Sequence, residues 1–353
     1  IMNIYYIDFE GNNTDAKVLL QNMTSEIFIK DSHDGKLIAH SAHHTPNGSI
    51  VAIDPKNPTQ WQMLARDFSN AVLVDIKPFK NKIICEYQSN LRPVINIIDY
   101  QGQVLHTIGD IPTGYSIHGF EGEYDDTELT YYLTSYVVPP VVYHFDLNTY
   151  EEKVKQYTKI RFDAKNFTYK ALTYPARDGT EIPMLIIHEK GKKPYEKGGR
   201  PLLLNAYGGF SVIATPSFDP GIVHFLEEGG IFAFANVRGG GDSGKQWWAQ
   251  GSGLNKQTSI YDFIDAAEYL IHENYTTAEK LASIGASNGG MLVGSAAVER
   301  PDLFGAVVAQ VGYYDMLRYE HYTVGHYHRD EYGSIADSVG FVSLLSYSPL
   351  HNV

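Results

Sequence analysis

The first half of the chain carries a repeat, and this feature most constrains the fold. Four apolar, strand-like runs each end in an aspartate: Asp8, Asp54, Asp99 and Asp146. Successive aspartates lie 46, 45 and 47 residues apart, with further alternating runs between them. A period near 45 residues with several short strands per unit is typical of β-propeller blades. A β-sandwich with evenly spaced strands is the competing interpretation, and three near-equal spacings favour the propeller.

Residues 1–160 are therefore predicted to form part of a β-propeller, with about three to four blades where known propellers have four to eight. Blades bury their faces against neighbouring blades, so a partial ring exposes an edge that favours association. Two interpretations follow from this: more blades lie upstream, or the chain is a fragment of a longer protein.

The pattern changes near Phe162, and residues 161–353 read as a second domain. Asp178-Gly179 is a strong turn signal and predicts a hairpin. Four apolar runs then alternate with helical segments: 201–205, 231–235, 281–284 and 306–310. Such runs are typical of a doubly wound, mostly parallel sheet that is covered on both faces. Apolar residues at helical spacing predict a helix from about residue 260 to residue 271, with Thr258 or Ser259 available to cap it.

The third of these apolar runs leads directly into Gly285-Ala286-Ser287-Asn288-Gly289-Gly290, followed by small residues at helical positions. In a nucleophile elbow, a strained serine between strand and helix needs small neighbours on both sides, as Gly285 and Gly289 provide. The elbow exposes the serine hydroxyl and directs the next backbone N–H, that of Asn288, at a developing oxyanion. The alternative is a structural turn with a capping serine. The strand before the motif and the helix after it favour Ser287 as the nucleophile of an α/β-hydrolase domain.

The first of the apolar runs leads into Tyr207-Gly208-Gly209-Phe210. Hydrolases of this fold place the second oxyanion donor in this loop, and the Tyr207 hydroxyl can serve in place of a backbone amide. A plain loop with an aromatic plug is the equally supported alternative.

Other features exclude several classes of function. The net charge of −13, without a basic block, disfavours nucleic-acid and membrane-surface partners. Residues 239–244 fit a dinucleotide glycine pattern, but no helix N-terminus is expected there to hold a pyrophosphate. The histidine-rich run 321–331 matches no zinc spacing, so neither a metal nor an organic cofactor is predicted. Cys85 is the only cysteine and is expected to be buried, which fits a reducing, cytoplasmic location.

Taken together, these segments resemble the prolyl oligopeptidase family of serine peptidases. The likeness runs from Tyr207-Gly208-Gly209-Phe210 through Asn236-Val237-Arg238 and the Ser287 elbow to Ser348-Pro349-Leu350-His351-Asn352-Val353. It covers all of 161–353 and, more loosely, the propeller half. The resemblance implies a propeller that covers the active site and admits only short peptides, which are cleaved after proline. It also implies that the full-length protein is a monomer.

By position, the resemblance makes Ser287 the nucleophile, and the Asn288 N–H and the Tyr207 hydroxyl the oxyanion hole. Phe210 and Tyr332 are expected to line the pocket for proline. Two positions depart from the family: His328 replaces a tryptophan that stacks on the proline, and Tyr313 replaces a small apolar residue. An imidazole is a smaller and more polar platform than an indole, so the departures indicate a broader or shifted specificity.

The catalytic acid and base are expected beyond Val353, because the chain order in this fold is Ser, then Asp, then His. Only one clear sheet strand follows Ser287, and His351 matches a non-catalytic family position. The predicted activity is therefore that of a serine endopeptidase acting through an acyl-enzyme. Two alternatives stay open: a catalytically incomplete pseudo-peptidase that serves as an interaction protein, and a peptide-transferring, macrocyclising relative.

Overall fold

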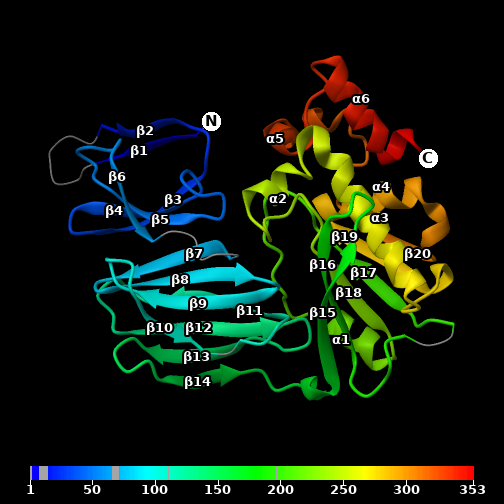
Figure 1. The fold of residues 1–353 in the computed structure, drawn as a ribbon, viewed down its shortest axis with the longest axis horizontal. Coiled ribbons are helices and arrows are strands. Elements are labelled where there is room, and N and C mark those ends of the chain that lie inside the picture. The colour runs from blue at the N-terminus through cyan, green and yellow to red at the C-terminus, as the bar shows by residue number, and fades with distance from the viewer. Residues whose placement is uncertain (1, 8–14, 66–70, 110, 196–197) are drawn as a thin grey trace.

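The computed structural model describes residues 2–7, 15–65, 71–109, 111–195 and 198–353. A series of small antiparallel sheets, stacked side by side, is followed by one larger mixed sheet with helices on both faces (Figure 1). Among the described residues, no helix combines the length and the apolar character needed to span a membrane.

The first part contains three four-stranded antiparallel meanders and one strand pair. The pair is β1 (Met2–Tyr6) with β2 (Lys17–Met23). The first meander comprises β3 (Ile27–His33), β4 (Lys36–Ser41), β5 (Ser49–Ile53) and β6 (Trp61–Ala65). The second comprises β7 (Val72–Phe79), β8 (Lys82–Ser89), β9 (Arg92–Ile98) and β10 (Val104–Ile108). The third comprises β11 (Tyr115–Glu121), β12 (Glu128–Ser135), β13 (Val141–Asp146) and β14 (Glu152–Tyr157). These are blades of a β-propeller, as the repeat predicts.

The repeated aspartates have one structural role. Asp54, Asp99 and Asp146 each follow or end the third strand of a blade. Each carboxylate accepts a hydrogen bond from the backbone N–H two residues later, at 2.8, 2.9 and 2.7 Å respectively. An aspartate that caps its own backbone favours a tight turn, here between the third and fourth strands. Asp8, the first member of the repeat, lies outside the described residues.

Each blade buries apolar side chains against the next. One cluster joins the β1–β2 pair to the first meander, a second joins the first meander to the second, and a third joins the second to the third. Ile83 and Cys85 on β8 face the first meander, and Ile84 faces the third. Cys85 is fully buried, as expected, and burial raises the pKa of its thiol.

The buried carboxyl of Glu86 on β8 lowers the stability of this packing when it is charged. Glu86 is 8% exposed, and Asp75 on β7 stands directly opposite it, so burial and like charge together raise its pKa to about 8. Because this folded-state pKa lies above the unfolded value, the stabilising effect of the protonated carboxyl is complete below about pH 4.5 and is lost as the pH rises through about 8. We expect Glu86→Gln to raise the free energy of unfolding above pH 8 by up to about 5 kcal/mol.

Urea titrations of the wild type and Glu86→Gln at acidic and alkaline pH measure this difference. Glu121→Gln, at an exposed position on β11, is the matched control and should change little at either pH. An equal effect of Glu86→Gln at both pH values would contradict the electrostatic explanation.

The larger sheet has the strand order β15-β16-β18-β17-β19-β20. Its strands are β15 (Phe167–Pro175), β16 (Glu181–Glu189), β17 (Leu202–Asn205), β18 (Ile231–Ala235), β19 (Leu281–Ala286) and β20 (Ala306–Gln310). The last four are parallel, while β15 and β16 form the expected antiparallel hairpin and β16 pairs antiparallel with β18. The helices are α1 (Pro220–Glu227), α2 (Lys245–Ala249), α3 (Lys256–His272), α4 (Asn288–Glu299), α5 (Arg329–Tyr332) and α6 (Ser338–Tyr347).

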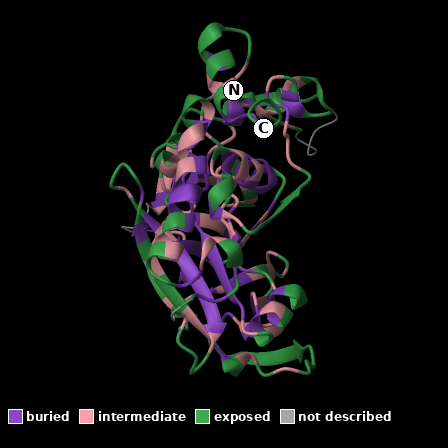
Figure 2. Cartoon of the chain, turned by 90° about the vertical axis from the view of Figure 1, so that its right-hand side faces the viewer, coloured by how far each residue is buried: buried purple, intermediate pink, exposed green. Residues whose placement is uncertain are grey.

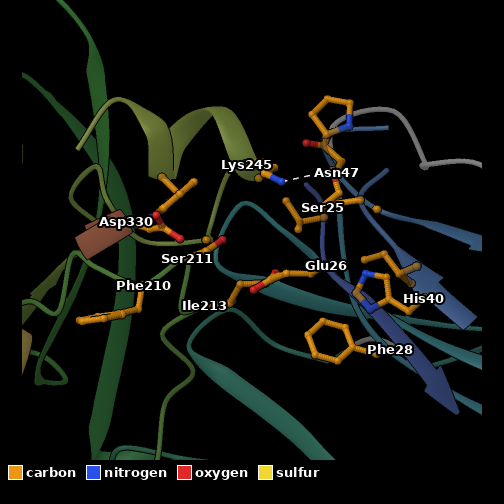
Figure 3. A pocket seen from close by; sticks show the side chains of 18 of the residues that line it. Ser25, Glu26, Phe28, His40, Asn47, Phe210, Ser211, Ile213, Lys245 and Asp330 are labelled. Atoms are coloured by element: carbon orange, nitrogen blue, oxygen red, sulfur yellow. Dashed lines mark hydrogen bonds between the residues drawn. The ribbon is translucent and has the colours of Figure 1, made fainter. Parts of the chain in front are cut away.

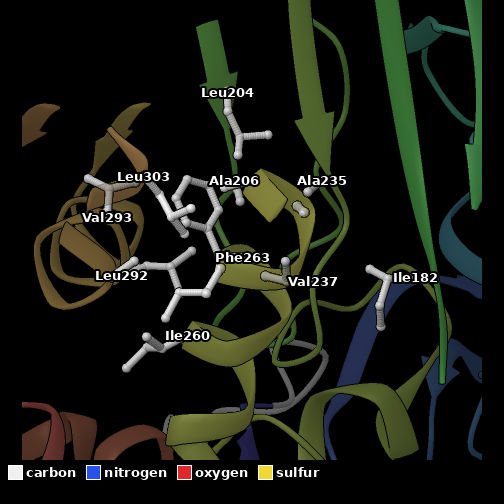
Figure 4. Close-up of a cluster of buried hydrophobic side chains, with 14 of the residues drawn as sticks. Ile182, Leu204, Ala206, Ala235, Val237, Ile260, Phe263, Leu292, Val293 and Leu303 are labelled. Carbon is white, nitrogen blue, oxygen red and sulfur yellow. The ribbon is translucent and has the colours of Figure 1, made fainter. Parts of the chain in front are cut away.

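Alternate residues of the central strands enter two different cores, because successive side chains of a strand point to opposite faces. On β18, Ala235 packs with α3 and α4 in the cluster of Figure 4, whereas Phe232 and Phe234 pack with α1 on the other face. Figure 2 shows the buried residues concentrated in these strands and in the helix faces against them. The second part is thus an α/β-hydrolase sheet covered on both faces, as predicted.

Among the described residues, β20 pairs only with β19 and its side chains are exposed. Two local predictions are wrong. Helix α3 begins at Lys256, so Ser259 lies inside the helix, where its hydroxyl donates to the backbone oxygens of Arg238 and Gly251 instead of capping. A short helix, α2, does begin directly after the glycine run 239–244, although it has only five residues.

Candidate active site

Ser287 forms a sharp turn between β19 and α4. Its backbone has φ 57° and ψ −121°, a left-handed conformation that costs a non-glycine residue strain, and its side chain is exposed. The turn is fixed on both sides, because the Ser287 N–H donates to the Gln310 carbonyl of β20 and the Met291 N–H donates to the Ser287 carbonyl. The exposed hydroxyl at the carboxyl end of a central strand is the predicted elbow geometry.

The neighbouring glycines allow the strand and helix to approach closely. A Cβ on Gly285 would lie 2.2 Å from the carbonyl oxygen of Gly289, and one on Gly289 would lie 2.6 Å from that of Ala206. A Cβ on Gly290 would lie 2.2 Å from the carbonyl oxygen of Gln310. Real Cβ atoms do not approach backbone this closely, so all three positions require glycine for this packing.

Two hydrogen-bond donors lie beside Ser287. Asn288 is the first residue of α4, and the first N–H groups of a helix have no partner inside it. The phenol of Tyr207, on the loop after β17, is in hydrogen-bond contact with the Ser287 side chain. Burial raises the pKa of this phenol, which keeps it a donor, although the Ser287 hydrogen bond opposes the shift. The Asn288 side chain donates to the Tyr207 carbonyl and so joins the two elements.

The four predicted substrate-binding residues meet in one group, called here the aromatic cluster: Phe210, Tyr313, His328 and Tyr332. The ring centroids of Phe210 lie 4.9 Å from His328 and 5.6 Å from Tyr332, with nearly perpendicular rings. Tyr313 lies 5.9 Å from His328 and 6.2 Å from Tyr332. The Tyr332 hydroxyl donates to the Asn288 side chain at 3.0 Å, which ties the cluster to the elbow. Nδ1 of His328 is buried without a hydrogen-bond partner in the described part of the chain.

A buried ion pair beneath the cluster is absent from the sequence-based prediction. Lys256 and Glu331 are 0% and 2% exposed in their side chains, and Nζ lies 2.6 Å from Oε1. The two residues are 75 positions apart in the sequence, and no local pattern pairs them. Glu331 lies next to Tyr332, one of the predicted substrate-binding residues.

A cavity of about 630 Å³ lies between the propeller and the aromatic cluster. Figure 3 shows Phe28 and His40 of the first meander, and Glu26 just before it, facing Phe210 and Asp330 across the cavity. Burial lowers the pKa of His40 to about 4, so its imidazole is neutral near pH 7. No sequence pattern points to the propeller residues that line this cavity.

Other predicted features lie apart from Ser287. His351 hydrogen-bonds to Ser348 at 2.8 Å, and none of the hydrogen bonds of the described histidines goes to Ser287. Within the described ranges, no three His, Cys, Asp or Glu side chains gather in a group that could hold a metal ion.

The comparisons with known proteins agree with this geometry. A model of the prolyl oligopeptidase family matches residues 216–353, and a model of the prolyl oligopeptidase N-terminal β-propeller domain matches residues 2–158. The chain belongs to the prolyl oligopeptidase family.

Several members of this family are similar along most of the chain. A prolyl endopeptidase of Elizabethkingia meningoseptica is 33% identical over 99% of this chain and 50% of its own length. One from Dictyostelium discoideum is 39% identical over 78% of this chain and 36% of its own length. The dual function macrocyclase-peptidase POPB of Amanita bisporigera is 29% identical over 95% of this chain and 46% of its own. The chain spans about half the length of these relatives.

Solved structures agree. A structure from a study of two prolyl endopeptidases superposes with a TM-score of 0.94 at 29% identity, covering 99% of this chain and 51% of the other. Prolyl oligopeptidase B of Galerina marginata, bound to a 25mer macrocyclization substrate, gives 0.91 at 26% identity, covering 99% and 49%.

Proposed function

We propose that the full-length protein is a serine endopeptidase that hydrolyses short peptides on the carboxyl side of proline. The observation that carries the proposal is the strained, exposed Ser287 with the Tyr207 phenol in contact with its side chain. The size of the cavity beneath the propeller supports short peptides as substrates. We also propose that the protein is monomeric and cytoplasmic. Cys85 is its only cysteine, so it has no internal disulfide that would require an oxidising compartment.

In the proposed reaction, the Ser287 hydroxyl attacks the peptide carbonyl carbon and gives its proton to a histidine base. The carbonyl oxygen becomes an oxyanion that accepts hydrogen bonds from the Asn288 N–H and the Tyr207 hydroxyl. Breaking the C–N bond releases the amine with that proton and leaves an acyl-enzyme, which water then hydrolyses. Phe210, Tyr332, His328 and Tyr313 are proposed to hold the residue before the cleaved bond.

The proposal is tested by incubating the full-length protein with a fluorophosphonate and mapping the labelled peptide. Label on Ser287, together with cleavage after proline in a peptide series varied at that position, supports it. A protein that takes no label on Ser287 is instead a pseudo-peptidase. The series also tests whether His328, with its unpaired ring nitrogen, shifts the preference away from proline.

A peptide-transferring activity is the second candidate, favoured by the similarity to macrocyclase-peptidases. In that reaction an amine captures the acyl-enzyme in place of water. Mass spectrometry of the products from a long proline-containing peptide separates the two, because cyclised product lacks the mass of one water relative to hydrolysed product.

Tyr207→Phe removes one proposed oxyanion donor and keeps the ring. We expect kcat to fall by about 10²- to 10³-fold, the usual loss for one such donor, with a small change in KM. Hydrolysis of a chromogenic proline peptide measures both constants. Tyr195→Phe, which alters a phenol that is 51% exposed, is the control and should match the wild type. An equal loss in both variants would refute the role of the Tyr207 hydroxyl.

A further inference from the structure

The carboxylate of Glu331 receives hydrogen bonds from three separate elements. Oε2 accepts from the Phe210 backbone N–H at 2.7 Å and from the Trp248 indole N–H at 2.7 Å, while Oε1 accepts from Lys256 at 2.6 Å. Glu331 itself belongs to α5, Trp248 to α2 and Lys256 to the start of α3. A carboxylate with donors on both oxygens, at 2% exposure, has a fixed position.

Lys256 extends this network to the oxyanion loop. Its ammonium also donates to the Gly208 carbonyl at 2.9 Å and lies 5.6 Å from the Tyr332 ring centroid. An ammonium that is fully buried must keep its partners, because an uncompensated charge in the interior is strongly unfavourable. The Gly208 carbonyl is therefore held as firmly as the Phe210 N–H.

The Gly208 carbonyl and the Phe210 N–H lie at the two ends of the loop 208–210, and the backbone is strained at the end of this loop. Phe210 and Ser211 have φ of 57° and 54°, outside the conformations that these residues prefer. Strained backbone persists only where its surroundings determine it. Tyr207, the proposed oxyanion donor, lies immediately before this loop, and Tyr332 of the aromatic cluster lies immediately after Glu331. The buried ion pair therefore connects the oxyanion donor to a ring of the aromatic cluster.

We propose that Glu331 and Lys256 are positioning residues that lock the loop of Tyr207 and Phe210 to the helix of Tyr332. Stabilisation of the oxyanion and selection of the substrate residue are thereby set together. The inference rests on the proposed peptidase function and adds to it the residues through which the two halves of the site are coupled. Neither Glu331 nor Lys256 contacts the reacting atoms.

The test compares two adjacent tryptophans in the full-length protein. Trp248→Phe removes one hydrogen bond to Glu331, whereas Trp247→Phe removes a hydrogen bond to the backbone oxygens of Asn236 and Val237. Titration with fluorophosphonate counts the active sites in each preparation. Per active site, we expect Trp248→Phe to lower kcat/KM for a proline peptide by about 10-fold. Its ratio of proline to alanine cleavage should fall as well, and Trp247→Phe should keep wild-type values of both.

Lys256→Met is the stronger variant, with an expected loss of about 100-fold or more. It loses the Gly208 contact and leaves a buried carboxylate, so it can fail to fold, in which case Trp248→Phe decides. If Glu331 and Lys256 only stabilise the fold, the variants should contain fewer sites that react with fluorophosphonate, but kcat and selectivity per reactive site should be unchanged. That result overturns the proposal. A wild type without label or cleavage would instead refute the peptidase function itself, so the two failures are distinguishable.

Discussion

Ser287→Ala is expected to abolish fluorophosphonate labelling of the full-length protein and to lower kcat by about 10⁴-fold or more. The hydroxyl is the only nucleophilic atom at the turn that both Tyr207 and Asn288 adjoin, and alanine leaves nothing to form the acyl-enzyme. Alanine adopts the strained φ of 57° about as readily as serine does, so the fold should survive. In-gel fluorescence measures the label, and hydrolysis of a proline peptide measures kcat.

Ser283 provides the matched control on the same strand. Its side chain is fully buried, and its hydroxyl has no hydrogen-bond partner among the described residues. Ser283→Ala therefore removes an unsatisfied polar atom and should retain full labelling with equal or slightly greater stability. Label retained in Ser287→Ala, or lost equally in both variants, would exclude Ser287 as the nucleophile.

The elbow could be predicted from sequence because its requirements are local. Strain at Ser287 demands small residues at fixed offsets, and Gly285 and Gly289 stand within four positions of each other. The blade turns are predictable for the same reason, since each aspartate bonds to the backbone two residues later. In both cases, the residues that determine the local geometry lie within a few positions of one another in the sequence.

Features that depend on distant parts of the chain were not predictable. Ser259 fits a helix cap by its local pattern, but its hydroxyl donates to the backbone oxygens of Arg238 and Gly251, which only the folded chain brings near it. No local pattern pairs Lys256 with Glu331, whose charged atoms lie 2.6 Å apart in the interior. The members of the aromatic cluster are predicted from the family resemblance, and their rings come together from three separate segments of the chain.

A second buried ion pair joins the loop after β18 to α3, and its loss should be the largest stability change outside the active site. Arg238 donates from Nε and Nη2 to the two oxygens of Asp262, at 2.9 and 2.6 Å, with side-chain exposures of 6% and 0%. It also contacts Asp178 at the hairpin turn and holds the pKa of that carboxyl at about 2. Arg238→Met should lower the free energy of unfolding by about 3–5 kcal/mol, because Asp262 is left buried without its counter-charge.

The dependence on pH identifies the cause. Burial already raises the pKa of Asp262 and Arg238 opposes the shift, so removing Arg238 raises that pKa further. A carboxyl whose folded pKa exceeds the unfolded value contributes stability that is lost as the pH rises, so urea titrations should show a larger loss at about pH 8 than at about pH 4. Arg300→Met, which removes an arginine from its pairs with Glu268 and Asp302, whose side chains are 46% and 62% exposed, should cost only about 1 kcal/mol. A loss in Arg238→Met that is the same at both pH values would place its origin in packing and not in the unpaired charge.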